Sequence, residues 1–122
     1  FALEKEFSFY LFNKNNENNI IGYFCFSNVV RGSFLSCFLG YNMDRDEINK
    51  GYMAEALQCG LEAIFNNKYL HRVEANVMPS NLASIKLLEK LGFICEGLSK
   101  KYLKINNKWE DHYHYVFLNN KV

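Results

Sequence analysis

One helix-like stretch stands between strand-like stretches in this sequence, and that order constrains the fold more than any other feature. From Met53 to Phe65 the apolar residues recur three and four positions apart, which defines one face of an α-helix. Residues 33–44 before it read as a strand, and apolar and polar side chains alternate in residues 71–78 after it. This strand–helix–strand crossover, within an otherwise antiparallel series, predicts a mixed sheet with helices packed against it.

The chain on either side of this unit predicts antiparallel strand pairs. Residues 7–26 contain two runs rich in aromatic and β-branched side chains, joined by an asparagine-rich turn. A last pair of strands surrounds Asn106 and Asn107, a dipeptide that favours a type I′ turn. Neither internal repeats nor a linker interrupt the series. We therefore expect one α+β domain over residues 1–122.

A second helix is predicted between Pro79 and Gly92. Pro79 ends the preceding strand, and Ser80 or Asn81 can cap the first helical turn. Gly92 favours the left-handed conformation in which many helices end. This prediction places a second helix start directly after the crossover strand.

Composition argues against several classes of protein. A net charge of +1 without long charged runs gives no electrostatic support for binding nucleic acid or a membrane surface. No apolar run approaches the ~20 residues that a membrane span needs. The four cysteines lie far apart, which predicts reduced and mostly buried thiols in a reducing compartment. We expect a cytoplasmic protein.

The two helix starts are the first candidates for binding a ligand. In "INKGYMAEAL" Gly51 and its neighbour Lys50 can receive a phosphate, because helix starts expose unpaired N–H groups. Alternatively, Asn49 caps the helix and Gly51 only permits the turn. In "MPSNLAS" Asn81 and Ser84 share one face of the first turn, either as a capping pair or as donors to an amide-bearing ligand.

Two polar patterns on strands are candidates for chemistry. Glu74 can remove a proton, directly or through water, or it can pair with Arg72 two residues away on the same face. His112 and His114 share a strand face with the spacing of some metal sites. No third ligand is apparent in the sequence, so we expect no metal.

Together these segments resemble the GNAT superfamily of N-acetyltransferases, and more closely its ribosomal-protein-alanine (Rim-type) branch. The resemblance runs from about residue 7 to residue 117. It is most specific in "SNVVRGSFLSCFLGYNMD", "NKGYMAEAL", "LHRVEANVMPSNLASIKLLEKLGF" and "EGLSKKYLKINNKWEDH". It implies a GNAT fold and an acetyl-CoA-dependent N-acetyltransferase. Since family members carry a strand and helices before the segment equivalent to residue 7, the resemblance also implies an N-terminal segment missing from this chain.

The resemblance assigns the coenzyme site to both helix starts and to the strand before the first one. The family pattern Gln/Arg-x-x-Gly-x-Gly/Ala, whose backbone amides hold the pyrophosphate, falls here on residues 48–53 and keeps only Gly51. Ile48 and Met53 replace its polar first and small last residues. The pantetheine arm would lie along residues 41–43 and reach Asn81. The coenzyme-binding residues so implied are Tyr41, Asn42, Met43, Asn49, Lys50, Gly51, Tyr52, Met53, Ala54, Asn81 and Ser84.

The resemblance also implies catalytic roles for Ser84 and Glu74. Many members use a tyrosine acid seven residues after the equivalent of Asn81, but Leu88 stands there, so Ser84 is expected to stabilise the departing thiolate. The usual base position aligns with Asn76, which cannot accept a proton, so Glu74 is expected to act through water.

The implied acceptor is the N-terminal α-amine of a protein, a ribosomal protein by resemblance. The alternatives are a small-molecule amine (a polyamine, an aminoglycoside or an amino acid) and a non-catalytic module that binds coenzyme A. We expect a monomer or homodimer without nucleic-acid or membrane partners. The acceptor side is assigned to Arg31, Asn76, Trp109, Asp111 and His112.

Overall fold

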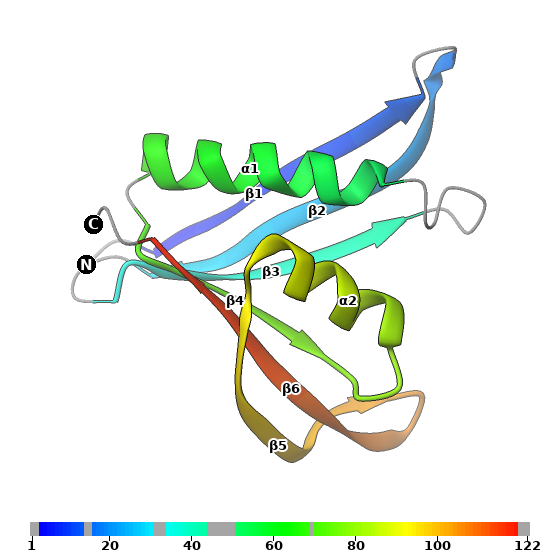
Figure 1. Cartoon of the computed structure of the whole chain (residues 1–122), viewed down its shortest axis with the longest axis vertical. Helices are drawn as coiled ribbons and strands as arrows, with labels where there is room; N and C mark the ends of the chain where they lie inside the picture. Colours follow the sequence, from blue (N-terminus) through cyan, green and yellow to red (C-terminus); the bar gives the residue numbers. More distant parts are fainter. Residues whose placement is uncertain (1–2, 14–15, 31–33, 44–50, 69, 120–122) are drawn as a thin grey trace.

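A mixed sheet and two helices make up the part of the chain that the computed structural model describes, residues 3–13, 16–30, 34–43, 51–68 and 70–119 (Figure 1). In that part the strand order is β1-β2-β3-β4-β6-β5, and β3 and β4 are parallel while the other neighbours are antiparallel. The predicted α+β fold with a mostly antiparallel mixed sheet is confirmed. The elements are β1 (Leu3–Asn13), β2 (Asn16–Val30), β3 (Ser36–Met43), α1 (Tyr52–Lys68), β4 (Arg72–Val77), α2 (Leu82–Leu91), β5 (Ile94–Ile105) and β6 (Lys108–Leu118).

Helix α1 packs closely on the sheet because its apolar face contains a glycine. The predicted face is buried, with Leu57 and Ile64 at 0% and 2% exposure, whereas Glu55 and Gln58 on the other side are exposed. A Cβ atom on Gly60 would lie 2.5 Å from the ring of Phe24, so only glycine allows this approach of helix and strand. The crossover connection thereby joins β3 to β4 over a well-packed core.

Both helices cover the same face of the sheet, which we call the helix face (Figure 1). The strand β4 shows how the sequence separates the two faces: Val73, Ala75 and Val77 are buried in the core below the helices. The alternate residues of β4 belong to the opposite side, which we call the far face. Polar groups on β4 are therefore held on the far face, behind the core.

The predicted turn at Asn106–Asn107 and the predicted caps of the second helix are present, whereas the cap predicted at Asn49 lies outside the described residues. Asn106 and Asn107 have φ angles of 52° and 64°, as a type I′ turn requires. Gly92 ends α2 with a φ of 99°, and Asn81 rather than Ser80 caps its start. The strand predicted over residues 33–44 begins at Ser36 in β3, after Leu35, whose carbonyl accepts hydrogen bonds from His71 and from the first residue of β4.

The prediction of mostly buried cysteines is wrong. All four are free thiols, but only Cys37 is buried, while Cys25 is half-buried and Cys59 and Cys95 are exposed. Cys59 lies on the solvent side of α1 and Cys95 on the outermost strand β5, so both thiols are open to solvent. None of the described helices has the length and apolar character needed to cross a membrane.

Candidate functional site

The strands β3 and β4 pair where they begin and then separate, which opens the middle of the sheet (Figure 1). Their parallel pairing runs from Ser36 with Arg72 to Phe38 with Glu74. β3 meanwhile remains paired with β2 as far as Met43. We call the opening between the separated strands the splay. Beyond Phe38, the edge of β3 toward β4 is left without a strand partner among the described residues, and an extended ligand with amide groups can pair with such an edge.

The strand residues predicted to hold the coenzyme lie in the splay. Tyr41 and Asn42 belong to the part of β3 that pairs only with β2, and Met43 is its last residue. Tyr41 is half-buried and shares the helix face with Cys37 and Leu39, whereas Asn42 is exposed. The structure therefore brings these three predicted residues together along a backbone edge that none of the described strands pairs.

Helix α1 begins at the end of the splay with a glycine in the left-handed conformation. Gly51 has a φ of 78°, and its carbonyl accepts a hydrogen bond from the Glu55 amide at 3.1 Å. The amides of the first helical turn point out of the helix start, as an anion requires. The side chain of Met53 lies in the core, with 7% exposure, so only its backbone is available to a ligand. The predicted residues Asn49 and Lys50, and the replacement at Ile48, lie outside the described residues.

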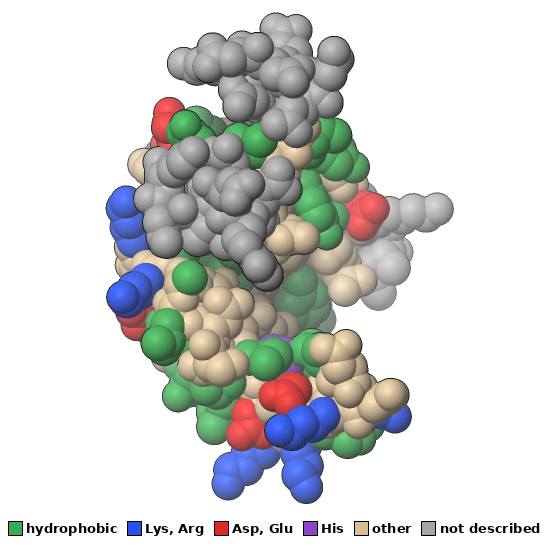
Figure 2. Space-filling view, turned by 90° about the vertical axis from the view of Figure 1, so that its right-hand side faces the viewer, with side chains coloured by type: hydrophobic (Ala, Val, Ile, Leu, Met, Phe, Trp, Pro, Cys, Tyr) green, Lys and Arg blue, Asp and Glu red, His purple; other side chains and the backbone are tan. Residues whose placement is uncertain are grey.

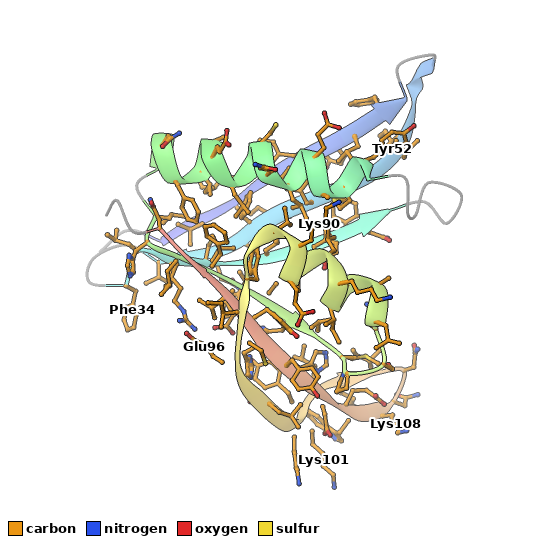
Figure 3. The ribbon with its side chains drawn as sticks, in the orientation of Figure 1. Phe34, Tyr52, Lys90, Glu96, Lys101 and Lys108 are labelled. Carbon is orange, nitrogen blue, oxygen red and sulfur yellow. The ribbon has the colours of Figure 1, made fainter. Side chains whose placement is uncertain are left out.

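A cavity of about 460 Å³ continues from this helix start along α1. Gly51 and Ala54 line its beginning, and Phe65 and Phe117 line its apolar end. Lys90 extends into it from α2, between the two helices (Figure 3). Its charge is of the sign that a phosphate needs, although Glu55 and Glu62 also border the cavity. Tyr52, also predicted to bind the coenzyme, is 43% exposed at the same helix start.

Helix α2 begins with a side-chain cap. The Asn81 side-chain oxygen accepts the amide hydrogen of Ser84 at 3.2 Å. The cap uses only the oxygen of the Asn81 side chain, and the residue is exposed, so its NH2 group can donate to a ligand. The two alternatives for Asn81, cap or ligand donor, are therefore compatible in one conformation.

The hydroxyl of Ser84 meets the phenol of Tyr41 across the helix face of the splay. Burial raises the pKa of Tyr41, and the hydrogen bond with Ser84 partly opposes that rise. The phenol is therefore protonated at neutral pH and can donate a hydrogen bond. Leu88, at the position of the usual tyrosine acid, is fully buried in the core. The sequence assigned Tyr41 only a backbone role, although alternation along β3 would have placed its side chain on the helix face.

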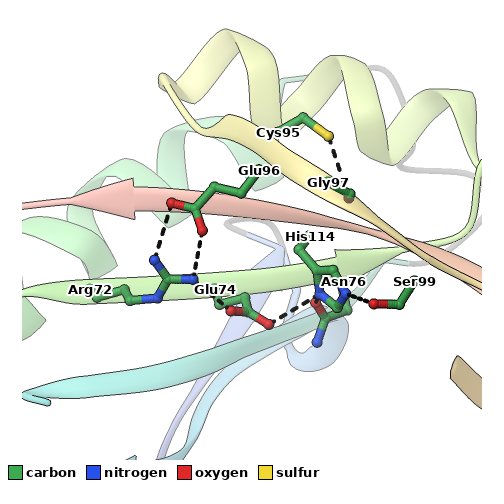
Figure 4. A network of polar contacts seen from close by, with 8 residues as sticks. All are labelled: Arg72, Glu74, Asn76, Cys95, Glu96, Gly97, Ser99 and His114. Carbon is green, nitrogen blue, oxygen red and sulfur yellow. Dashed lines mark hydrogen bonds and ion pairs between the residues drawn. The ribbon is translucent and has the colours of Figure 1, made fainter.

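On the far face, a chain of polar contacts lies where β3 and β4 begin to separate (Figure 4). Arg72 Nη2 lies 2.9 Å from Glu74 Oε1 and 3.0 Å from Glu96 Oε1. The second oxygen of Glu74 lies 3.3 Å from Nδ1 of His114. That ring also contacts the Asn76 side-chain oxygen through Nδ1 and the Ser99 hydroxyl through Nε2, each at 2.6 Å.

This network contains one ion pair that the sequence analysis considered and two residues that it missed. The ion pair between Arg72 and Glu74, one of the two alternatives for Glu74, is present. Glu96 also pairs with Arg72, and the hydrogen bonds from that guanidinium lower the pKa of Glu96. The sequence missed Glu96 and Ser99 because both lie on β5, which reaches this network only through its pairing with β6.

The residues assigned to the acceptor side belong mainly to the β5–β6 hairpin, which ends in a surface rich in lysine and acidic side chains (Figure 2). Trp109 is 55% exposed. Asp111 instead accepts the backbone amide of Lys101 at 2.9 Å, and His112 is 3% exposed with its ring nitrogen near the Glu110 carbonyl. Asp111 and His112 thus have structural partners of their own. Arg31 lies outside the described residues.

Among the residues that the structure describes, no three His, Cys, Asp or Glu side chains gather closely enough to hold a metal ion. His112 and His114 do share a face of β6, where the ring of Tyr102 contacts both. His114 is engaged by Asn76 and Ser99, and His112 by a backbone carbonyl. These contacts account for the histidine pair.

Two parallel strands that separate, with a helix beginning after each of them, form the architecture of an acyl-CoA-binding transferase fold. The chain belongs to the GNAT acetyltransferase family: the family model described as "Acetyltransferase (GNAT) domain" matches residues 1–94. The resemblance that the sequence predicts is confirmed.

Three relatives place the chain beside the Rim-type enzymes. The ribosomal protein uS5-alanine N-acetyltransferase of Escherichia coli (strain K12) is 46% identical over 87% of this chain and 54% of its own length. The solved ribosomal-protein-S5-alanine acetyltransferase of Vibrio fischeri is 38% identical, with a TM-score of 0.91 over 94% of this chain and 62% of that one. RimJ of Mycobacterium smegmatis in complex with CoA-disulfide is 33% identical, with a TM-score of 0.81 over 85% and 50%. The chain thus spans between half and two thirds of these relatives.

Proposed function

We propose that this protein is an acetyl-CoA-dependent N-acetyltransferase that acts by direct attack of an amine, and that its acceptor is the N-terminal α-amine of a protein. The observation that carries the proposal is the splay, with the Tyr41–Ser84 pair on its helix face and the Glu74 network on its far face. Direct attack needs a group that takes a proton from the amine and another that stabilises the departing thiolate. Two polar groups on opposite sides of one opening meet that need.

The fit of the coenzyme rests on three features of the chain. The edge of β3 beyond Phe38, which has no strand partner within the described part of the chain, can pair with the amide groups of a pantetheine arm. The start of α1 at Gly51 can hold a pyrophosphate through its backbone amides. The Asn81 NH2 group can donate to the arm from the other side. When bound there, acetyl-CoA would supply an activated acetyl thioester.

The remaining residues have roles around that thioester. Ser84, supported by Tyr41, donates a hydrogen bond to the thiolate that leaves. The far-face network accepts a proton from the amine, and Glu74 and Glu96 attract its cationic form. No metal takes part in this scheme.

A protein α-amine is the preferred acceptor on two grounds. Its pKa of about 7.7–8.0 leaves a useful neutral fraction near pH 7, in contrast to lysine near 10.4. The relatives at 46% and 38% identity are both named for acetylating the alanine of a ribosomal protein. A ribosomal protein N-terminus, modified in the cytoplasm, is therefore the acceptor we propose.

The test separates binding from turnover. Calorimetry with acetyl-CoA should show saturable binding, and thiol release should follow addition of peptides that begin with alanine or serine. Spermidine and an aminoglycoside serve as competing acceptors in the same assay. Faster release with either of those would replace the protein acceptor by a small-molecule amine. Binding without release on any amine would leave a coenzyme A-binding module, and absence of binding would refute the proposal.

A further inference from the structure

The imidazole of His114 is held in one orientation by two acceptors on β4. Its Nδ1 lies 2.6 Å from the Asn76 side-chain oxygen and 3.3 Å from Glu74 Oε2. A carboxylate oxygen and an amide oxygen can only accept hydrogen bonds, so the proton of the neutral ring belongs on Nδ1. Nε2 consequently carries the lone pair.

That lone pair points at the hydroxyl of Ser99. The two atoms are 2.6 Å apart, and the neutral ring can only accept at Nε2, so Ser99 donates its hydrogen there. The Ser99 oxygen then has lone pairs left over, which can accept a proton from an amine or from a water between them. A hydroxyl in this position passes a proton on to the imidazole.

Glu74 is already engaged at both of its oxygens. Oε1 accepts from Arg72 at 2.9 Å, and Oε2 faces the N–H group of His114. This arrangement suits a carboxylate that balances the charge of an imidazolium. It is a poorer arrangement for a base, because both oxygens already face donors rather than an incoming amine.

The network lies beside the splay, on the side opposite to Tyr41 and Ser84, the groups proposed to stabilise the thiolate. Glu74 is the last β4 residue paired with β3, and Asn76, two residues on, lies where the strands have separated. His114 is the β6 partner of Asn76 in the sheet register. Tyr41 and Ser84 belong to the helix face, so the splay would separate them from an amine on the far face.

We infer that His114, linked through the Ser99 hydroxyl, is the group that takes the proton from the acceptor ammonium, and that Asn76 and Glu74 position its ring. The inference rests on the proposed function. The ammonium gives one proton by way of Ser99 to Nε2 and keeps the electron pair of the broken N–H bond. His114 becomes an imidazolium beside the Glu74 carboxylate. It later returns the proton to solvent, while the second proton lost by the nitrogen ends on the thiolate.

This assignment predicts the acid side of the pH dependence. Protonation of the free ring removes the lone pair at Nε2, so turnover should fall as the pH decreases. The charged or titratable groups around His114 are Glu74 and Arg72 from β4, Glu96 and Tyr102 from β5, and His112 on its own strand. Of these, Glu74 is the one in direct contact with the ring as an ion-pair partner.

The decisive variant is His114→Asn. The Asn side chain can keep an N–H group near the position of Nδ1, and hence the contact with Asn76, but it has no base in place of Nε2. We expect kcat/KM for an alanine peptide to fall about 100-fold, with the acid limb of the pH profile lost. The Kd for acetyl-CoA should stay within about twofold of wild type, because the network lies on the far face. Added imidazole should restore part of the turnover of His114→Gly.

Matched variants distinguish His114 from its neighbours. Glu74→Gln keeps an oxygen near His114 and should lower turnover while retaining an acid limb; if Glu74 were the base, that limb would vanish. Tyr102→Phe keeps the ring that contacts His114 and should leave the profile unchanged. Independently of turnover, long-range ¹⁵N NMR of the ligand-free protein should show His114 as the Nδ1–H tautomer in its neutral form.

The possible results distinguish a failure of this inference from a failure of the proposed function. An unchanged acid limb in His114→Asn, or an Nε2–H tautomer for His114, would overturn the inference while leaving acetyl transfer intact. An absence of turnover by the wild-type protein with every amine would overturn the proposed function and this inference with it.

Discussion

The two helices that border the splay begin in opposite ways. α1 is preceded by Gly51, which contributes no side chain and has a left-handed conformation with nothing within 4 Å of a Cβ placed there. α2 is preceded by its cap Asn81, whose side chain bends back onto the Ser84 amide. The start of α1 can bind a ligand through backbone amides, whereas the start of α2 presents side-chain groups.

This difference explains why the sequence keeps one family pattern and loses the other. Backbone amides persist when side chains change, so the start of α1 can carry Ile48 and Met53 in place of the usual residues. The functions of Asn81 and Ser84 reside in an amide and a hydroxyl, which few other side chains supply. Substitutions should therefore act through charge and conformation at α1 and through lost chemical groups at α2.

The largest effect is expected from Ser84→Ala, which removes the hydroxyl that meets Tyr41. Loss of one donor to a developing negative charge should lower kcat by about 100-fold with little change in the Kd for acetyl-CoA. Ser84→Thr, which keeps a hydroxyl, is the control and should retain most of the activity. A kcat unaffected by the alanine substitution would show that another group stabilises the thiolate.

The next effect concerns charge at the start of α1, tested by the pair Gly51→Asp and Gly51→Asn. Both residues tolerate a positive φ better than other side chains, and both fit the open space around Gly51. Asp should stabilise the free protein relative to Asn because it favours the helix dipole, yet weaken acetyl-CoA binding about tenfold by repelling the pyrophosphate. Thermal unfolding and calorimetry would measure the two quantities. Equal affinities of the two variants would place the phosphates elsewhere.

Local features of the structure were predictable from the sequence because they depend on neighbouring residues. The period of α1, the left-handed Gly92 and the Asn106–Asn107 turn each follow from local sequence pattern and conformational preference. Asn81 and Ser84 were found for the same reason, since they lie in one helical turn.

The far-face network could not be predicted in the same way, because it depends on sheet register. His114 is 38 residues from Asn76 and 15 from Ser99 in sequence. The β5 register also shifts between Cys95 and Gly97 and again after Ser99, so counting along the strands would have paired the wrong residues. The Tyr41–Ser84 contact, across 43 residues, depends likewise on the splay.

A smaller effect should separate the two roles of Asn81. Asn81→Ala removes the cap and should cost about 1 kcal/mol of stability, as well as weakening acetyl-CoA binding about fivefold. Asn81→Asp keeps the capping oxygen but not the NH2 group, so it should retain stability and show a similar loss of affinity. Urea unfolding and calorimetry on both variants would test this. If the Asn81→Asp variant binds acetyl-CoA as tightly as wild type does, Asn81 is only a cap.

The smallest effect, and the one that probes how β3 joins the start of α2, is expected from Tyr41→Phe as the pH rises. At neutral pH the variant should be less stable than wild type because it lacks the hydrogen bond with Ser84. Since burial raises the pKa of Tyr41 in the folded protein, the unfolded state loses this phenolic proton first as the pH passes about 10. The wild type then loses stability that the variant cannot lose, so the difference in their free energies of unfolding should become smaller. Urea unfolding at pH values on both sides of about 10 would measure it, and a gap that stays constant would mean that Tyr41 titrates alike in the folded and unfolded chain.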